Sequence, residues 1–350
     1  MEYTSTFRNA SALLVLTCFA LAPAGAQSIP GFTAPAGYIA TLTDLPTSGI
    51  AISPSGLLAV SNSNSSGGGT LSIYDRVEGT RTLLKTFSAP AGDTFRFFGG
   101  LTFADDNTLY FGENGAAKTV FRADLTGGSV TKLAPNGSVP SVAGVAFHSG
   151  SVYALSAGDP GSGAVYQLTG GLASVFASNL GSGYLGGIDF AMDGSLYVGD
   201  TNDPDFVGNA GNLLKIGASG TVVQTISLSG GGGSGLYDFA FDSEGDIFAS
   251  TGKTLTEVHL GATPLVSNFG TFSGSFPFPT SVTFRGGGFM PYSGTGSLYV
   301  GGEFTGVGGV FRIQPTAVPE PSSVFGLAFA SGGAFSLLRL RRVRLNRKRA

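Results

Sequence analysis

A pattern of alternating apolar and polar positions recurs six times along the chain. In each copy a short apolar strand precedes a polar turn and a second strand with an aromatic residue, as in residues 187–198, Gly-Ile-Asp-Phe-Ala-Met-Asp-Gly-Ser-Leu-Tyr-Val. The first apolar positions of the copies are Ile50, Leu101, Val145, Ile188, Phe239 and Val282. Their spacing of 43 to 51 residues is typical of the blades of a β-propeller.

Each copy continues with further strand-like segments. Third strands are expected at residues 70–75, 119–124, 164–168, 212–216, 255–259 and 309–313. Fourth strands follow in five copies, for example at residues 82–87 and 174–178, whereas the sixth copy stops at Ile313 without one. Residues 38–42 form a strand-like segment ahead of the first copy, and we expect this segment to complete the last blade. Such a closure joins the two ends of the ring and removes an exposed strand edge.

These repeats predict an all-β fold, a six-bladed β-propeller closed by its N-terminal strand. The composition agrees with this prediction, since the chain has 57 Gly and 28 Phe and shows no long stretch of helical periodicity between its two end segments. An open sandwich of stacked hairpins is the structural alternative.

The first 26 residues have the pattern of a secretory signal peptide. Arg8 precedes an apolar stretch at residues 12–22, and Ala24-Gly25-Ala26 forms a small-residue cleavage site. The only cysteine, Cys18, lies in this leader. After cleavage by signal peptidase the body therefore has no disulfide and no thiol nucleophile.

The last part of the chain has three sections in a fixed order. A short motif of Val318, Pro319, Glu320 and Pro321 precedes an apolar run at residues 324–338, and a basic end follows with Arg339, Arg341, Arg342 and Arg344 among its cations. Fifteen residues give about 22 Å of helix against a hydrocarbon core of roughly 30 Å, so this run predicts a short transmembrane helix. The arginines are expected to stay in the cytoplasm. A buried core helix followed by a nucleic-acid-binding tail is the alternative.

The order of these three sections resembles the sorting tail of the PEP-CTERM proteins of Gram-negative bacteria, with Pro319, Glu320 and Pro321 as the signature tripeptide. The resemblance implies processing by an exosortase, a membrane-embedded protease. It also implies a protein that is exported, tethered to the inner membrane through its tail, and then released to the cell envelope or the medium. The predicted organisation is a signal peptide at 1–26, a propeller at 27–315 and a sorting tail at 316–350.

Charge separates the body from the two ends. The body has 11 Lys and Arg against 20 Asp and Glu, so it is strongly acidic. The net charge of the whole chain is only −3, because the basic tail offsets the charge of the body. An acidic body disfavours nucleic acid as a partner and suits metal ions or cationic partners.

Acidic and amide side chains follow several of the predicted second strands. In a propeller the turns after second strands share one face with the links between blades, so these side chains are expected around one mouth of the channel. The candidate ligands are Glu113, Asp200, Asn202, Asp203 and Glu303. Such oxygen donors suit Ca²⁺ or Mg²⁺. The alternative is that they are solvated turn residues, because Asp and Asn favour loops for their own backbone hydrogen bonds.

The phrase Asp-Gly-Ser-Leu-Tyr-Val-Gly-Asp-Thr at residues 193–201 resembles strand pairs of NHL-repeat and gluconolactonase-like six-bladed propellers. That resemblance supports the fold more than an activity. It implies that a metal held by Glu, Asn and Asp could polarise a lactone at the channel mouth.

No catalytic set stands out in the sequence. The only two histidines are His148 and His259, and a catalytic triad would need one of them near an activated serine. No Gly-x-Ser-x-Gly elbow stands between a strand and a helix. Two functions stay open. The preferred one is a non-enzymatic envelope or matrix protein that binds a partner such as an exopolysaccharide or an envelope protein. The other is a divalent-metal-dependent, gluconolactonase-like hydrolase.

Overall fold

The computed structural model describes residues 27–29, 31–43, 49–201, 211–228, 235–273, 278–287, 289–291, 294–304 and 307–316. The predicted signal peptide lies outside the described residues, and so does the predicted sorting tail apart from Thr316. The undescribed part of the tail includes Val318, Pro319, Glu320, Pro321, Arg339, Arg341, Arg342 and Arg344.

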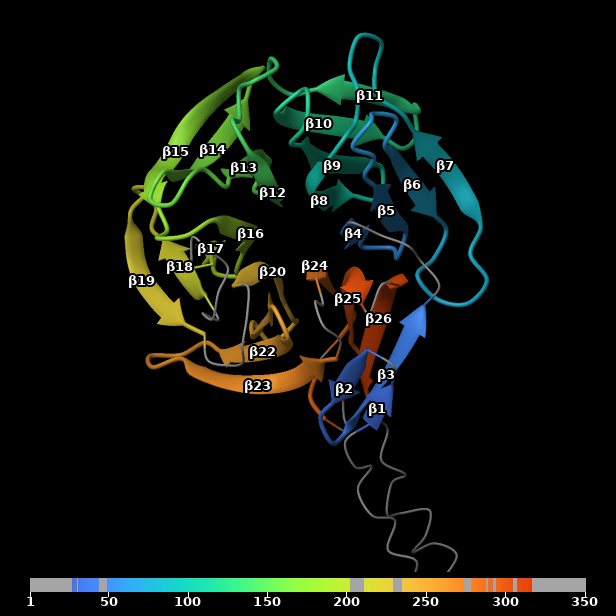
Figure 1. Cartoon of the computed structure of the whole chain (residues 1–350), viewed down its shortest axis with the longest axis vertical. Coiled ribbons are helices and arrows are strands. Elements are labelled where there is room, and N and C mark those ends of the chain that lie inside the picture. The colour runs from blue at the N-terminus through green and yellow to red at the C-terminus, as the bar shows by residue number, and fades with distance from the viewer. Residues whose placement is uncertain are drawn as a thin grey trace, which may run out of the picture.

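The described strands form six sheets arranged as blades around a central axis (Figure 1). Blade 1 contains β4 (Gly49–Ile52), β5 (Leu58–Asn62), β6 (Thr70–Tyr74) and β7 (Leu83–Phe87). Blade 2 contains β8 (Phe98–Asp105), β9 (Thr108–Glu113), β10 (Thr119–Asp124) and β11 (Ser129–Lys132). Blade 3 contains β12 (Val142–His148), β13 (Ser151–Ser156), β14 (Gly163–Thr169) and β15 (Leu172–Leu180).

The second half of the ring repeats this order. Blade 4 contains β16 (Leu185–Phe190), β17 (Leu196–Asp200), β18 (Asn212–Ile216) and β19 (Val222–Ser227). Blade 5 contains β20 (Leu236–Phe241), β21 (Ile247–Thr251), β22 (Thr254–His259) and β23 (Leu265–Phe272). Blade 6 contains β24 (Phe278–Arg285), β25 (Ser297–Phe304), β26 (Val307–Pro315) and β3 (Tyr38–Thr43). The first strand of each blade is innermost and contacts the first strand of the next, and β24 contacts β4, so the ring is closed.

The predicted closure by the N-terminal strand is confirmed. β3 pairs antiparallel with β26, so that Leu42 lies opposite Phe311 and Ala40 opposite Ile313. The six predicted third strands are also confirmed, as β6, β10, β14, β18, β22 and β26. The fold is thus the six-bladed propeller and not the open sandwich of hairpins.

A second N-terminal element was not predicted. β1 (Gln27–Ile29) and β2 (Phe32–Ala34) form a hairpin, and β2 pairs with β23, so blade 5 gains two strands on its outer side. The ring of Phe32 lies 5.0 Å from that of Phe272 in blade 5 and 5.7 Å from that of Phe311 in blade 6. The N-terminal segment therefore joins blades 5 and 6 in two ways, by pairing its two parts with different blades and by packing one ring between them.

Buried apolar clusters fill the six interfaces between neighbouring blades. Because successive side chains of a strand point to opposite faces of its sheet, a blade in a ring packs one apolar face on each neighbour. Phenylalanine supplies much of this layer, as between blades 1 and 2, where Phe95, Phe111 and Phe121 lie with ring centroids 5.2 to 5.5 Å apart. The core is therefore a set of radial layers.

The innermost strands approach one another closely, and glycine permits this approach. Gly100 and Gly187 adopt φ values of +89° and +75°, next to register shifts in the pairing of β8 and β16. A Cβ atom on Gly100 would lie 2.8 Å from the Cα atom of Gly144 in the next blade. Two features of the glycine, its left-handed backbone and its missing side chain, are thus both required here.

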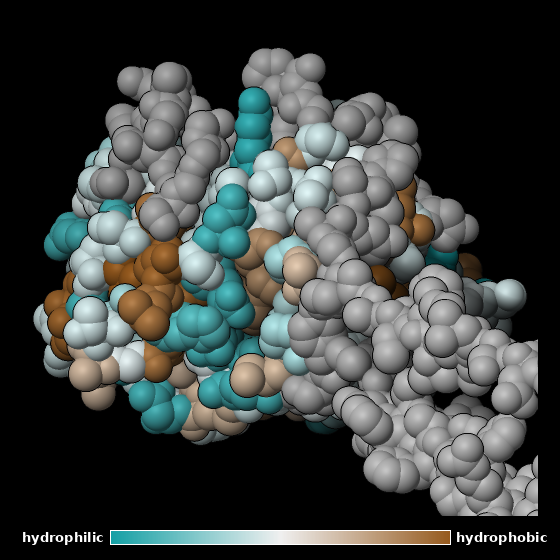
Figure 2. Space-filling view, turned by 90° about the horizontal axis from the view of Figure 1, so that it is seen from below, coloured by the Kyte–Doolittle hydropathy of each residue, from teal (hydrophilic) through white to brown (hydrophobic). Residues whose placement is uncertain are grey.

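The outermost strands expose apolar side chains to solvent. The exposed large apolar residues on β7, β15, β19 and β23 are Leu83, Leu84, Leu172, Val175, Val222, Val223 and Leu265. On the side of the ring that faces down in Figure 1, apolar and hydrophilic patches alternate (Figure 2). Among the described residues, no helix has the length and the hydropathy of a membrane span.

Candidate functional site

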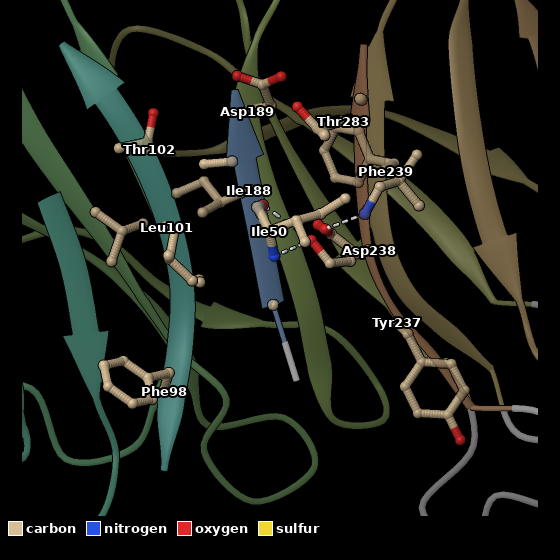
Figure 3. Close-up of a pocket in the computed structure, with 18 of the residues that line it drawn as sticks. Ile50, Phe98, Leu101, Thr102, Ile188, Asp189, Tyr237, Asp238, Phe239 and Thr283 are labelled. Atoms are coloured by element: carbon tan, nitrogen blue, oxygen red, sulfur yellow. Dashed lines mark hydrogen bonds between the residues drawn. The ribbon is translucent and has the colours of Figure 1, made fainter. Parts of the chain in front are cut away.

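The centre of the ring encloses a cavity of about 440 Å³ that the first strands of all six blades line (Figure 3). Most of the lining residues are apolar in type, among them Phe98, Phe103 and Phe284, but polar atoms make up the larger part of the surface that faces the cavity, to which Tyr237 adds a phenol. Among the described residues that line the cavity, the charged types are two carboxyls, Asp189 on β16 and Asp238 on β20, and none is Lys, Arg or His.

Both carboxyls depart from the repeat. The position before the first apolar residue is glycine in four blades, as Gly49, Gly100, Gly144 and Gly187, but Asp238 in blade 5 and Ser281 in blade 6. Asp189 stands where the other copies have the small residues Ala51, Thr102, Ala146, Ala240 and Thr283. The fold by itself needs only a small residue at each of these positions, so the two carboxyl side chains are candidates for a functional role.

Asp238 and Ser281 each bond to the innermost strand of the following blade. The Oδ2 atom of Asp238 accepts a hydrogen bond of 2.8 Å from the backbone N–H of Val282. The Oγ atom of Ser281 accepts one of 3.1 Å from the N–H of Ile50 and donates one of 3.1 Å to its carbonyl. These side chains thus hold successive inner strands together across two blade interfaces.

Burial of the two carboxyls disfavours their charged forms. Burial among the apolar strands raises the pKa of Asp189 to about 6, although the N–H groups of Phe190 and Phe241 lower it in part. Burial also raises the pKa of Asp238 to about 7, against the effect of the Val282 and Phe239 N–H groups, and the charge of Asp189 adds to the increase. Near neutral pH the pair can therefore both donate and accept hydrogen bonds and can exchange a proton with a bound molecule.

Neither carboxyl is among the metal ligands predicted from the sequence. The structure places Asp189 within β16 and Asp238 within β20. The signal that could have found both is the comparison of equivalent positions among the six copies, where a carboxyl replaces a small residue.

Glu113, one of the predicted metal ligands, is fully buried at the end of β9. Its Oε1 atom accepts hydrogen bonds from the backbone N–H groups of Arg96, at 3.1 Å, and Gly115, at 2.8 Å. Its Oε2 atom accepts one of 2.7 Å from Ala117. The carboxylate therefore holds the link into blade 2 against the turn after β9.

Asp200 has the equivalent place at the end of β17 and the equivalent contacts. Its Oδ2 atom accepts a hydrogen bond of 3.1 Å from the N–H of Ser182, and its Oδ1 atom accepts one of 3.0 Å from the N–H of Gly183. Those residues form the link into blade 4. The side chain is 2% exposed, so it too stabilises a link between blades.

The rest of the predicted metal set is described less fully. Asn202 and Asp203 lie outside the described residues, and Glu303 is placed in β25 without a described side chain. The structure does not bring Glu113 and Asp200 together, because each bonds to the backbone of its own blade. The Ca²⁺ or Mg²⁺ site at the mouth stays a prediction.

Comparisons with known proteins support the fold. No family model and no curated protein matches the chain. Among solved structures, a catalytically inactive virginiamycin B lyase from Staphylococcus aureus, solved with quinupristin, is similar with a TM-score of 0.54 and 13% identity, over 80% of this chain and 100% of that one. A protein assigned as a gluconolactonase has a TM-score of 0.53 and 17% identity, over 81% and 94% of the two chains. A Bacteroides thetaiotaomicron protein of unknown function has a TM-score of 0.53 and 13% identity, over 83% of each chain.

These likenesses, together with the ring of six sheets, define the class: the body is a six-bladed β-propeller that resembles those of gluconolactonases and virginiamycin B lyases. Identities of 13 to 17% show the fold alone. Function must be argued from the residues of the channel.

Proposed function

We propose that the protein is an exported propeller of the bacterial envelope that binds a small hydroxyl-rich ligand, such as the end of a polysaccharide chain, in its central channel without converting it. The observation that carries the binding function is the pair of carboxyls in a channel that the repeat otherwise lines with small and apolar residues. Signal peptidase and an exosortase deliver the protein, and the tail tethers it to the inner membrane before release.

The size and the lining of the channel fit this ligand class. A volume of about 440 Å³ lies within the roughly 300–1,000 Å³ range of small-molecule sites. Aromatic rings pack against the apolar faces of a sugar ring, and partly protonated carboxyls bond its hydroxyl groups as donor and acceptor. Asp189 and Asp238 come from adjacent blades, so one ligand can contact both.

A second candidate function is the metal-dependent hydrolysis of a lactone. The near-neutral pKa values of Asp189 and Asp238 favour it, because such groups suit general acid–base catalysis. Its metal ligands would come from the predicted mouth residues. The backbone hydrogen bonds that engage Glu113 and Asp200 weigh against that ligand set.

Binding is tested by calorimetric titration of the full chain with a panel of neutral mono- and disaccharides. We expect at least one to bind with a Kd of about 10 µM to 1 mM. Asp189→Asn should weaken that binding about 10- to 100-fold, because it removes a hydrogen-bond partner that can be charged. Asp159→Asn, an exposed carboxyl on blade 3, is the matched control and should leave the Kd unchanged. Absence of binding by the whole panel, or turnover of gluconolactone that requires Ca²⁺ or Mg²⁺, contradicts this function.

Sorting is tested separately in the producing cells. Replacing Pro319, Glu320 and Pro321 by alanine should keep the protein at its full length in the inner-membrane fraction. The wild-type protein should lose its tail and reach the cell surface or the medium. Ser322→Ala with Ser323→Ala is the control and should be processed normally. Equal release of the motif variant, as measured by fractionation and mass spectrometry, would remove the sorting part of the proposal.

A further inference from the structure

We propose a binding site for a divalent transition-metal ion of the Zn²⁺ class on blade 5, with His259 and Glu257 as ligands and Asp246 as the residue that orients the histidine. The site goes beyond the channel function and does not depend on it. By the topology of the blade it lies on the opposite face of the ring from the predicted acidic mouth, since it is formed by the β20–β21 turn and the end of β22.

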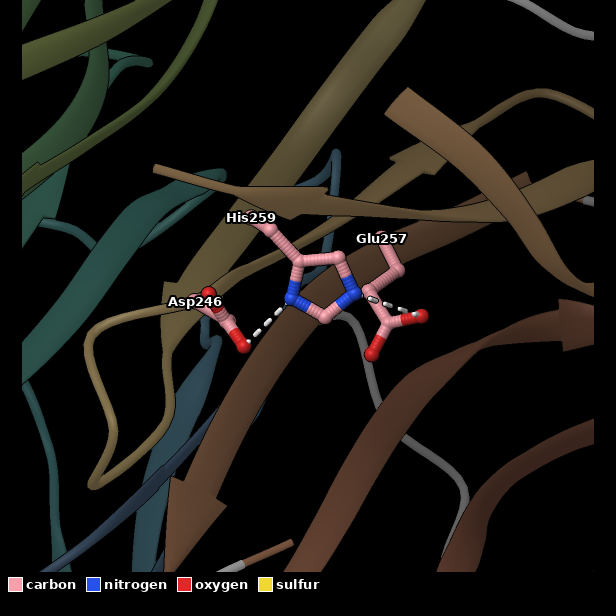
Figure 4. A group of neighbouring side chains, drawn as sticks. All are labelled: Asp246, Glu257 and His259. Carbon is pink, nitrogen blue, oxygen red and sulfur yellow. Dashed lines mark hydrogen bonds and ion pairs between the residues drawn. The ribbon is translucent and has the colours of Figure 1, made fainter. Parts of the chain in front are cut away.

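The three side chains come together through the strand geometry of blade 5 (Figure 4). Glu257 and His259 are two residues apart on β22, so their side chains leave the same face of the sheet. Asp246 ends the neighbouring turn, directly before β21. One ligand-type atom of each side chain lies within 4.8 Å of those of the other two, and among the described residues this is the only such group of three or more His, Cys, Asp or Glu.

The two nitrogens of the histidine have different neighbours. Nδ1 lies 2.7 Å from Oδ2 of Asp246, which is a hydrogen bond, whereas Nε2 lies 3.7 Å from Oε2 of Glu257, which is too long for one. Donation of the Nδ1 proton to Asp246 leaves the lone pair of Nε2 directed toward Glu257. A histidine that binds a metal through one nitrogen commonly gives the other N–H to a carboxylate in this way.

The 3.7 Å separation suits two ligands of one ion. Nitrogen and oxygen ligands bind Zn²⁺ at about 2.0–2.2 Å, which places two ligands of a tetrahedral ion about 3.4 Å apart. His259 and Glu257 are therefore within a few tenths of an ångström of that spacing. Ser267 stabilises the position of the carboxylate, since its hydroxyl donates a hydrogen bond of 3.3 Å to Oε2 of Glu257.

The surroundings of the site are negatively charged and leave it accessible to an ion. Asp242 and Glu244, in the β20–β21 turn, add two carboxylates to those of Asp246 and Glu257. Within the described part of the chain, no ion pair joins Lys or Arg to any of these four residues. The side chain of His259 is 46% exposed, so an ion can reach Nε2 and water can complete its coordination. A divalent cation would offset the mutual repulsion of the carboxylates.

The donor types favour a transition metal over Ca²⁺ and Mg²⁺. Imidazole suits Zn²⁺, Cu²⁺ and Ni²⁺, whereas Ca²⁺ and Mg²⁺ need several oxygen ligands. This selectivity distinguishes the site from the Ca²⁺ or Mg²⁺ site predicted at the other face.

The test is calorimetric titration of the chelator-treated full chain with Zn²⁺ and, separately, with Ca²⁺. We expect one equivalent of Zn²⁺ to bind at least 100-fold more tightly than Ca²⁺. His259→Gln should lower the Zn²⁺ affinity at least 10-fold, while His148→Gln, the change of the other histidine, should not alter it. Retention of the Zn²⁺ affinity in His259→Gln, or equal affinity for Ca²⁺, would overturn the proposal.

A spectroscopic measurement on the unaltered protein keeps the proposal testable if a variant fails to fold. With ¹⁵N-labelled histidine the chain gives four ring-nitrogen signals, two from each of its two histidines. Zn²⁺ should shift the Nε2 resonance of His259 while its Nδ1 stays protonated. Asp246→Asn should weaken Zn²⁺ binding about 10-fold and leave Nε2 as the ligand atom. A shift of the Nδ1 resonance, or no shift at all, contradicts the assigned geometry.

Discussion

Phe32→Ala is expected to lower the free energy of unfolding by about 3–5 kcal/mol, the usual range for the loss of a buried phenylalanine ring. Phe32 is 0% exposed and packs against Phe272 in blade 5 and Phe311 in blade 6. Gly270 leaves the space for the ring, since a Cβ atom there would overlap it. The substitution therefore opens a cavity at the interface between blades 5 and 6. Urea denaturation of the full chain measures the change.

Leu42→Ala is the matched control for this prediction. Leu42 lies on β3, in the same N-terminal segment, but its side chain is 46% exposed. We expect its loss to lower the free energy of unfolding by less than about 1 kcal/mol. If Phe32→Ala destabilised the protein no more than Leu42→Ala does, the packing of the hairpin would not contribute to the joining of blades 5 and 6.

Asp238→Asn is expected to stabilise the protein at pH 8, by up to about 4 kcal/mol. Burial raises the pKa of Asp238 from 3.8 to about 7. Between pH 3.8 and about pH 7, Asp238 of the folded protein keeps a proton that the unfolded chain has lost. The contribution of this group to the free energy of unfolding therefore falls as pH rises. Three pKa units correspond to about 4 kcal/mol, and the full penalty is present above pH 7. An asparagine keeps an acceptor for the N–H of Val282 and has no charge to bury.

The measurement is the difference in free energy of unfolding between Asp238→Asn and the wild-type protein, by urea denaturation at pH 4, 6 and 8. We expect the difference to be small at pH 4 and to grow up to pH 8. Carboxylates that are the same in both proteins cancel in this difference. A difference that stays constant from pH 4 to pH 8 would mean that Asp238 ionises as it does in water.

The two roles of Asp238 oppose each other. The carboxyl of Asp238 destabilises the fold at neutral pH, yet it lines the ligand cavity. Such a trade-off between stability and function is common at binding sites. We therefore expect Asp238→Asn to combine higher stability with weaker saccharide binding.

The propeller could be predicted because its pattern of alternating apolar and polar residues is repeated along the chain. Each blade carries the same alternation of apolar residues, and six copies at blade spacing are hard to explain in another way. The closing strand at residues 38–42 could be predicted because the sixth copy lacked its fourth strand. The β1–β2 hairpin could not, since two strands of three residues show too little periodicity.

The candidate site was less predictable. Glu113 and Asp200 were expected to face a metal ion, but a carboxylate next to a turn can equally bond backbone N–H groups, and only the folded loops show which it does. His259 was not recognised as a metal ligand, because Asp246, its hydrogen-bond partner, lies before β21 whereas His259 ends β22. Contacts between side chains of different strands depend on register, which sequence patterns do not report.

The sequence by itself determined the strand period, the number of blades and the order in which they close, because alternation of apolar residues is a local property that survives in every copy. The tertiary structure alone decided which side chains share an environment. Asp189 and Asp238 are 49 residues apart in the sequence and meet at one channel because the ring places neighbouring inner strands side by side. Their altered pKa values follow from that burial, and burial is a property of the assembled ring.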